Sequence, residues 1–197
     1  MGVGKRPDAV EVGAVSVATA RFEGVYERHV RAVTAYCGRR LPADQVADGV
    51  ADTFLVVWRR IDDVPDGDAE RLWLYRVAHR VVGQAWRSAR RHRRLGVRMA
   101  SLRPVGAADT EEAVMDGDDV VRVRAALDRL KPPDAEVLRL SVWERLDASE
   151  IAHVLEITSN AVHQRLHRAR QHLVREYDAI GMRTASGAAG LERGGAR

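Results

Sequence analysis

The strongest fold signal in this chain lies at residues 71–95, which read RLWLYRVAHRVVGQAWRSARRHRRL. Apolar residues recur there with the spacing of one helix face, at Leu74, Val77, Val81 and Ala85. At about 100° per residue, four arginines fall together on another face, at Arg76, Arg80, Arg87 and Arg94. The segment predicts an amphipathic helix that packs one side against a core and exposes these four residues, the arginine face, on another.

Two tryptophans, Trp73 and Trp86, border the arginine face. The sequence leaves two interpretations of each open. A tryptophan is most often packed at least partly against a neighbouring helix. A tryptophan beside arginines is also the kind of ring on which an unpaired base stacks.

A second helix is expected before this one, from about Asp44 to Ile61. Its apolar face carries Val46, Val50, Thr53 and Val57. Its outward positions are Asp48, Asp52 and Arg59, with Phe54 and Trp58 flanking the core. An acidic face bordered by aromatic rings suits a protein partner that carries basic residues, although a solvated helix is the alternative interpretation.

Residues 130–173 predict a pair of helices joined by a short turn, and read LKPPDAEVLRLSVWERLDASEIAHVLEITSNAVHQRLHRARQHL. Asp147 and Glu150 have the spacing of a capping box for the first helix of this pair. Thr158 or Ser159 can cap the longer helix that follows.

The longer helix has two faces of different chemistry. Its apolar positions are Val162, Leu166, Ala169 and Leu173. The opposite side carries amide, imidazole and guanidinium groups at Asn160, Gln164, His167, Arg168 and Gln171, flanked by His163, Arg165 and Arg170. This pattern is typical of a helix-turn-helix whose second helix reads base edges and holds phosphates. His163 and His167 have the spacing of metal ligands, but without cysteine or acidic ligands nearby no metal site is expected.

Charge is segregated along the 197 residues, which carry 32 Lys+Arg against 28 Asp+Glu. Residues 71–98 hold nine arginines and no acid, whereas residues 105–120 hold six acids and no base. An acid-free arginine segment attracts polyanions, while a merely solvated helix face interleaves the two signs. The charge pattern therefore favours nucleic acid as a partner.

Several classes of protein are excluded by what the sequence lacks. The single Cys37 allows no internal disulfide, and no apolar stretch is long enough to span a membrane. Asp8 and Glu11 disfavour a signal peptide, so a cytoplasmic protein is expected. No nucleophile–base pair, metal cluster or phosphate loop is placed for chemistry, so neither enzymatic activity nor a cofactor is expected.

The periodicity and its interruptions predict an all-α chain of two small helical domains joined by a flexible acidic linker. The expected parts are a flexible arm at 1–20, a helical domain at 21–98, the linker at 99–119, the helix-turn-helix domain at 120–178 and a disordered tail at 179–197.

The two domains together resemble an RNA polymerase sigma factor of the extracytoplasmic-function (ECF) group. The matching segments of the first domain are FEGVYERHVRAVTAYCGRR (22–40), VADTFLVVWRR (50–60) and residues 71–95. Those of the second are LKPPDAEVLRLSVWERL (130–146) and SEIAHVLEITSNAVHQRLHRARQHL (149–173). The resemblance implies a promoter-specificity subunit, with a first domain similar to sigma region 2 and a second similar to region 4.

The resemblance also implies which residues contact which partner. The clamp helices of core RNA polymerase would be bound by Asp48, Asp52, Phe54, Trp58 and Arg59, and the polymerase flap by the second domain. The unpaired −10 strand would be held by Trp73, Arg76, Arg80, Gln84, Arg87, Arg90 and Arg91. The −35 element would be read by Ser159, Asn160, His163, Gln164, Arg165, His167 and Arg168. An anti-sigma factor that masks the polymerase-binding surfaces is a further implied partner.

The sequence departs from the family pattern at Gly49, Ala51, Arg80, Gln84, Arg145 and Glu156. Members often carry Leu and Gln at the first two positions, Asn and Asp at the next two, and Gly at the last two. The last two are turn positions, where a left-handed conformation would cost a non-glycine residue about 1 kcal/mol.

Two alternatives to a promoter-specificity subunit stay open. A stand-alone helix-turn-helix regulator would bind duplex DNA without polymerase, but it would not need the arginine face. A sigma-like interaction module would act only through protein partners, and the departures from the family pattern favour it.

Overall fold

The computed structural model describes residues 9–95 and 117–192, and the chain divides into two compact units between residues 109 and 110. Within the described residues the chain forms seven α-helices, one short 3-10 helix and no strand. The prediction of an all-α fold with two helical domains is confirmed.

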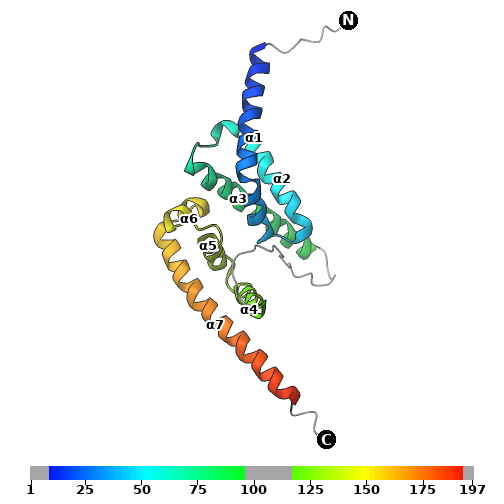
Figure 1. Ribbon diagram of the computed structural model, residues 1–197, viewed down its shortest axis with the longest axis vertical. Coiled ribbons are helices and arrows are strands. Elements are labelled where there is room, and N and C mark those ends of the chain that lie inside the picture. The colour runs from blue at the N-terminus through cyan, green and yellow to red at the C-terminus, as the bar shows by residue number, and fades with distance from the viewer. Residues whose placement is uncertain (1–8, 96–116, 193–197) are drawn as a thin grey trace. The chain divides into compact units, whose positions relative to one another are not determined.

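The first unit is built from three long helices, α1 (Ala9–Gly38), α2 (Ala43–Arg59) and α3 (Asp68–Leu95), with the 3-10 helix η1 (Ile61–Asp63) between the last two (Figure 1). Each long helix packs against both of the others. The core between them includes the fully buried Tyr36 of α1, Val57 of α2 and Leu74 of α3. Of the predicted apolar stripe of α3, Leu74 and Val77 are buried, whereas Val81 and Ala85 are half-buried and Val82 is buried beside them. Burying each large side chain contributes on the order of 2 kcal/mol.

A glycine lets α2 approach α1 closely. Gly49 is buried, and a Cβ atom there would lie 2.6 Å from Cδ1 of Leu41 and 3.6 Å from Sγ of Cys37. Leu41, itself buried, occupies the space that a side chain at position 49 would need, which accounts for the departure at this position. Burial also raises the pKa of the Cys37 thiol to about 11, so the thiol stays protonated.

A buried carboxylate ties the start of α3 to α1. Glu70 is only 6% exposed, and it accepts hydrogen bonds from Arg28 at 2.9 and 3.0 Å and pairs with Nε2 of His29 at 2.5 Å. Burial raises the pKa of Glu70, but the hydrogen bonds from Arg28 and His29 outweigh it and hold the pKa below its ordinary value. About two turns earlier on the α1 surface, Arg21 donates to the carbonyl of Val64 at 2.6 Å. These contacts fix the loop between α2 and α3 and so set where α3 begins.

The second unit contains α4 (Gly117–Leu127), α5 (Pro132–Val142), α6 (Ala148–Leu155) and α7 (Ser159–Glu192). The long α7 packs against each of the other three helices (Figure 1). Leu140 of α5, Ile151 of α6 and Val162 of α7 are fully buried where these helices meet.

The local signals predicted around α6 and α7 are present. Asp147 accepts hydrogen bonds from the backbone N–H groups of Ser149 and Glu150, and the Glu150 carboxylate accepts one from the N–H of Asp147 at 2.8 Å. The predicted capping box is therefore confirmed. Thr158 caps α7, since its Oγ1 accepts a hydrogen bond from the N–H of Ala161 at 3.2 Å.

The two turn positions that lack the expected glycine adopt the left-handed conformation. The φ angle is 54° at Arg145 and 56° at Glu156. Glu156 ends α6 directly before the turn into α7. Each turn therefore keeps its left-handed conformation without glycine, at a cost of about 1 kcal/mol of backbone strain.

Two predicted boundaries need correction, because helices extend further than expected. Residues 9–20 belong to α1 and not to a flexible arm, and residues 179–192 belong to α7 and not to a disordered tail. Once a packed segment forms a helix, each added residue gains a hydrogen bond without a new nucleation cost. The second extension is also supported by α4, since the guanidinium of Arg122 packs against Gly181, where a Cβ atom would lie 3.0 Å from Cζ of Arg122. Of the predicted linker, residues 99–116 lie outside the described residues and 117–119 belong to α4.

Candidate nucleic-acid interface

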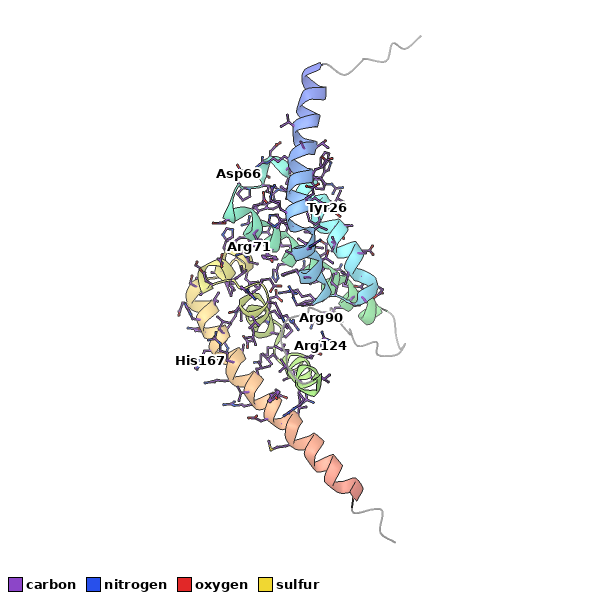
Figure 2. All side chains as sticks on the ribbon, viewed as in Figure 1. Tyr26, Asp66, Arg71, Arg90, Arg124 and His167 are labelled. Atoms are coloured by element: carbon purple, nitrogen blue, oxygen red, sulfur yellow. The ribbon has the colours of Figure 1, made fainter. Side chains whose placement is uncertain are left out.

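The arginine face lies on the surface of α3. Arg80 and Arg87 are exposed, Arg76 is half-buried and Arg94 belongs to the same helix. Three further residues predicted to hold a single strand, Gln84, Arg90 and Arg91, are exposed as well (Arg90 is labelled in Figure 2). The structure thus brings these predicted strand-binding residues together on one accessible helix.

The two tryptophans of α3 have different environments. Trp73 is 5% exposed and lies within the core of the first unit, with the guanidinium of Arg60 5.9 Å from its ring centroid. Its predicted role as a stacking ring is therefore not compatible with this structure, because neighbouring helices cover the ring. Trp86 is 36% exposed, and its indole N–H donates to the carbonyl of Arg40 at 3.1 Å.

The predicted polymerase-binding side of α2 is accessible except at Phe54. Asp48, Asp52 and Arg59 are exposed, and Trp58 is 41% exposed. Phe54 is buried, so it supports this surface from below and does not present its ring to a partner.

An aromatic cluster of Phe22, Tyr26, Phe54 and Trp58 joins α1 to α2. The ring centroids of Phe22 and Trp58 are 5.3 Å apart, and those of Tyr26 and Phe54 are 4.7 Å apart. Tyr26, labelled in Figure 2, is as exposed as Trp58. Sequence reasoning missed Phe22 and Tyr26, although their i, i+4 spacing on one helix face was a usable signal.

The outer side of α7 presents the predicted reading groups. Six of these side chains are exposed and one, Arg165, is half-buried; the exposed ones are Ser159, Asn160, His163, Gln164, His167 and Arg168. His167 is labelled in Figure 2, and its Nε2 atom lies 2.9 Å from the Nε2 atom of Gln171. Nη2 of Arg168 lies 3.5 Å from Oδ1 of the buried Asp134 on α5. Contacts within the protein therefore orient part of this face.

Two features are not found in the described part of the chain. No helix there has both the length and the apolarity needed to cross a membrane. No cluster of three or more His, Cys, Asp or Glu side chains there is arranged to hold a metal ion.

Comparison with known proteins assigns both units to one family. Residues 25–92 match the family model for Sigma-70 region 2, and residues 121–173 match that for Sigma-70 region 4. The ECF RNA polymerase sigma factor SigD of Mycobacterium tuberculosis is 31% identical over 186 residues, covering 90% of this chain and 87% of that protein. The chain belongs to the ECF RNA polymerase sigma factors. It is accordingly a promoter-specificity subunit that associates with core RNA polymerase and promoter DNA in transcription initiation.

Other sigma factors are similar in sequence or in fold. The RNA polymerase sigma factor NccH of Alcaligenes xylosoxydans xylosoxydans is 28% identical over 166 residues, covering 77% of this sigma factor and 84% of NccH. The structure of CnrH in complex with the cytosolic domain of CnrY has a TM-score of 0.55 and 26% identity, and the match covers 80% of this chain and 88% of CnrH. The sigma factor RpoE of Bartonella quintana, solved with the anti-sigma factor NepR, shares the fold with a TM-score of 0.62 at 19% identity, covering 80% and 96% of the two chains.

Proposed function

We propose that this sigma factor engages its promoter through two separate surfaces, the arginine face of α3 and the outer side of α7. The observation that carries the proposal is that each unit exposes one DNA-compatible helix face of different chemistry. A face of arginines binds phosphates through charge, whereas amide, imidazole and guanidinium groups can also pair with base edges.

The α3 surface is proposed to hold the unpaired strand of the −10 element. Arg76, Arg80, Arg87, Arg90 and Arg91 lie along one helix and would contact successive phosphates. Gln84 lies among them and has both a donor and an acceptor for a base edge. The absence of acids from residues 71–98 supports this assignment, because no carboxylate of this segment opposes a phosphate.

The amino-terminal half of α7 is proposed to enter the major groove at the −35 element. Asn160, Gln164 and His167 share the outward side and are suited to base edges, with Ser159 and His163 beside them. Arg165, which is half-buried, and Arg168, which is exposed beside the buried Asp134, are proposed to contact phosphates.

Core polymerase is proposed to bind the exposed side of α2 together with the aromatic cluster. Asp48 and Asp52 offer negative charge to a basic partner, while Tyr26 and Trp58 supply apolar area. Aromatic rings that are partly buried within their own protein are common anchors in such interfaces.

A protein that covers these surfaces is the proposed regulator. CnrH and RpoE were each solved with a partner protein, CnrY and the anti-sigma factor NepR respectively. By analogy, an anti-sigma factor would keep this sigma factor inactive in the cytoplasm until it is released. No catalytic step is assigned to the chain itself.

In vitro transcription tests the proposal directly. Purified full-length protein is added to core polymerase on a library of genomic promoter fragments, and defined start sites are expected only when both components are present. Arg165→Ala with Arg168→Ala is expected to abolish initiation at those sites. Start sites that survive this double substitution would favour the interaction module, and a strong duplex footprint without polymerase would favour the stand-alone regulator.

A further inference from the structure

Trp86 is an exposed aromatic ring within the basic surface of α3. It is 36% exposed, compared with 5% for Trp73 on the same helix. The side chain has one polar atom, the indole nitrogen, and its N–H already donates to the carbonyl of Arg40 at 3.1 Å. The exposed part of Trp86 is therefore apolar ring.

The position of the Trp86 ring is held by a buried partner. Arg40 is only 5% exposed, and its guanidinium lies 3.6 Å from the ring centroid of Tyr36 and donates to the carbonyl of Tyr36 at 3.2 Å. The backbone N–H of Arg40 also donates to the carbonyl of Cys37 at 2.9 Å. The hydrogen bond from Trp86 thus ends on a well-packed segment, which limits the freedom of the ring before any ligand binds.

The surroundings of the ring are cationic and open on one side. Gly83 precedes Trp86 by nearly one turn, and a Cβ atom there would meet only Nη1 of Arg87, at 3.3 Å. Arg87 and Arg90 are both exposed, and Arg90 is on the same helix side as the gap at Gly83. An apolar protein partner would have to desolvate these guanidinium groups, whereas a nucleotide supplies phosphates to pair with them.

We propose that Trp86 is a stacking platform for an unpaired nucleobase, with Arg87 and Arg90 contacting the phosphates beside it. This proposal rests on the −10 strand function proposed for α3 and adds a residue to which that function gives no role. Stacking on an aromatic ring tolerates any base, so Trp86 strengthens the capture of a single strand without reading its sequence.

Binding of oligo(dT) of roughly 20 nucleotides to the full-length protein tests the proposal by fluorescence anisotropy at low salt. Trp86→Leu removes the aromatic face and is expected to weaken binding by at least about fivefold. The slope of log affinity against log salt is expected to stay unchanged, because no charge is removed. Trp86→Phe keeps an aromatic face and is expected to stay within about threefold of wild type.

Trp143 provides the matched control, since it is a similarly exposed tryptophan of the second unit. Trp143→Leu is expected to bind oligo(dT) like wild type. Oligo(dT) binding by Trp86→Leu that equals wild type would overturn the proposal. An equal loss in Trp86→Leu and Trp86→Phe, at unchanged thermal stability, would overturn it as well, because the hydrogen bond and not the ring face would then matter.

Transcription with core polymerase separates this inference from the function on which it rests. If the wild type initiates at promoters and Trp86→Leu leaves oligo(dT) binding unchanged, the stacking role is wrong while the sigma function stands. If Trp86→Leu weakens oligo(dT) binding and the wild type fails to initiate, the stacking role stands while the proposed promoter function is wrong. Permanganate oxidises unpaired thymines. Lower reactivity of −10 thymines in promoter complexes of Trp86→Leu than of wild type would therefore support both the stacking role and the promoter function.

Discussion

The exposed faces of α3 and α7 both carry cations, but their neighbours differ. On α3, Arg87 and Arg90 belong to a segment without a single acid. On α7, Arg168 lies 3.5 Å from a buried carboxylate of Asp134, and His167 pairs with Gln171. A surface that binds by charge needs only density of cations, whereas a surface that reads base edges needs oriented groups. Under the proposed function, this contrast assigns affinity to α3 and sequence preference to α7.

The largest effect is expected from removing the cations of α3. Replacing Arg76, Arg80 and Arg87 with alanine should reduce the slope of log affinity against log salt by about 2 for single-stranded DNA, because about three phosphate contacts are lost. Titration of oligo(dT) at several salt concentrations measures the slope. An unchanged slope would contradict the assignment of affinity to this face.

The matching change on α7 sharpens the comparison. With the polymerase holoenzyme, Gln164→Ala should lower the preference for a mapped −35 element over unrelated duplex by roughly tenfold, the loss of one good base contact. Competition binding at fixed salt measures the ratio. The slope of log affinity against log salt should stay unchanged in Gln164→Ala. An altered slope would contradict the assignment of sequence preference, rather than charge-based affinity, to α7.

The anchoring of α3 is tested at Glu70. Glu70→Gln should destabilise the first unit by about 1–2 kcal/mol, because charge-assisted hydrogen bonds to Arg28 and His29 are lost. Since the folded pKa of Glu70 is lowered, its contribution is complete above the ordinary carboxyl pKa and disappears as the pH falls through the lowered value. The substitution should therefore matter at neutral pH and progressively less in acid.

Amide hydrogen exchange of α3 as a function of pH measures this contribution. Asp66→Asn is the control, because Asp66 pairs with Arg21 at 3.2 Å while its side chain is 93% exposed. Such an exposed pair contributes little, so the control should leave exchange nearly unchanged. A loss from Glu70→Gln that does not shrink in acid would contradict the ionic origin.

The smallest effect is expected at the turn before α7. Glu156→Gly should stabilise the second unit by up to about 1 kcal/mol, because glycine adopts the left-handed conformation without a Cβ clash. Arg145→Gly should act in the same direction. Hydrogen exchange of α6 and α7 measures the gain, and a loss of protection would show that the Glu156 side chain contributes more than its strain costs.

Much of the second unit was predictable because its signals are local. The capping box at Asp147 and Glu150 depends on residues three apart, and the left-handed turn at Glu156 follows from where α6 must end. The helical periods of α3 and α7 likewise need only the neighbouring turns. Helix ends were predicted less well, since the extension of α7 is supported at Gly181 by Arg122 on a different helix.

The sequence by itself determined which residues share a face of each helix, because that depends only on 3.6 residues per turn. The tertiary structure alone decided which of those faces is covered. Trp73 and Trp86 border the same arginine face, yet packing buries the first and leaves the second accessible. Phe54 and Glu70 are buried for the same reason, since Tyr26 and Arg28 reach them from α1 across a long sequence separation. Helical spacing gives an angle around one axis, and only the neighbouring helices determine what lies at that angle.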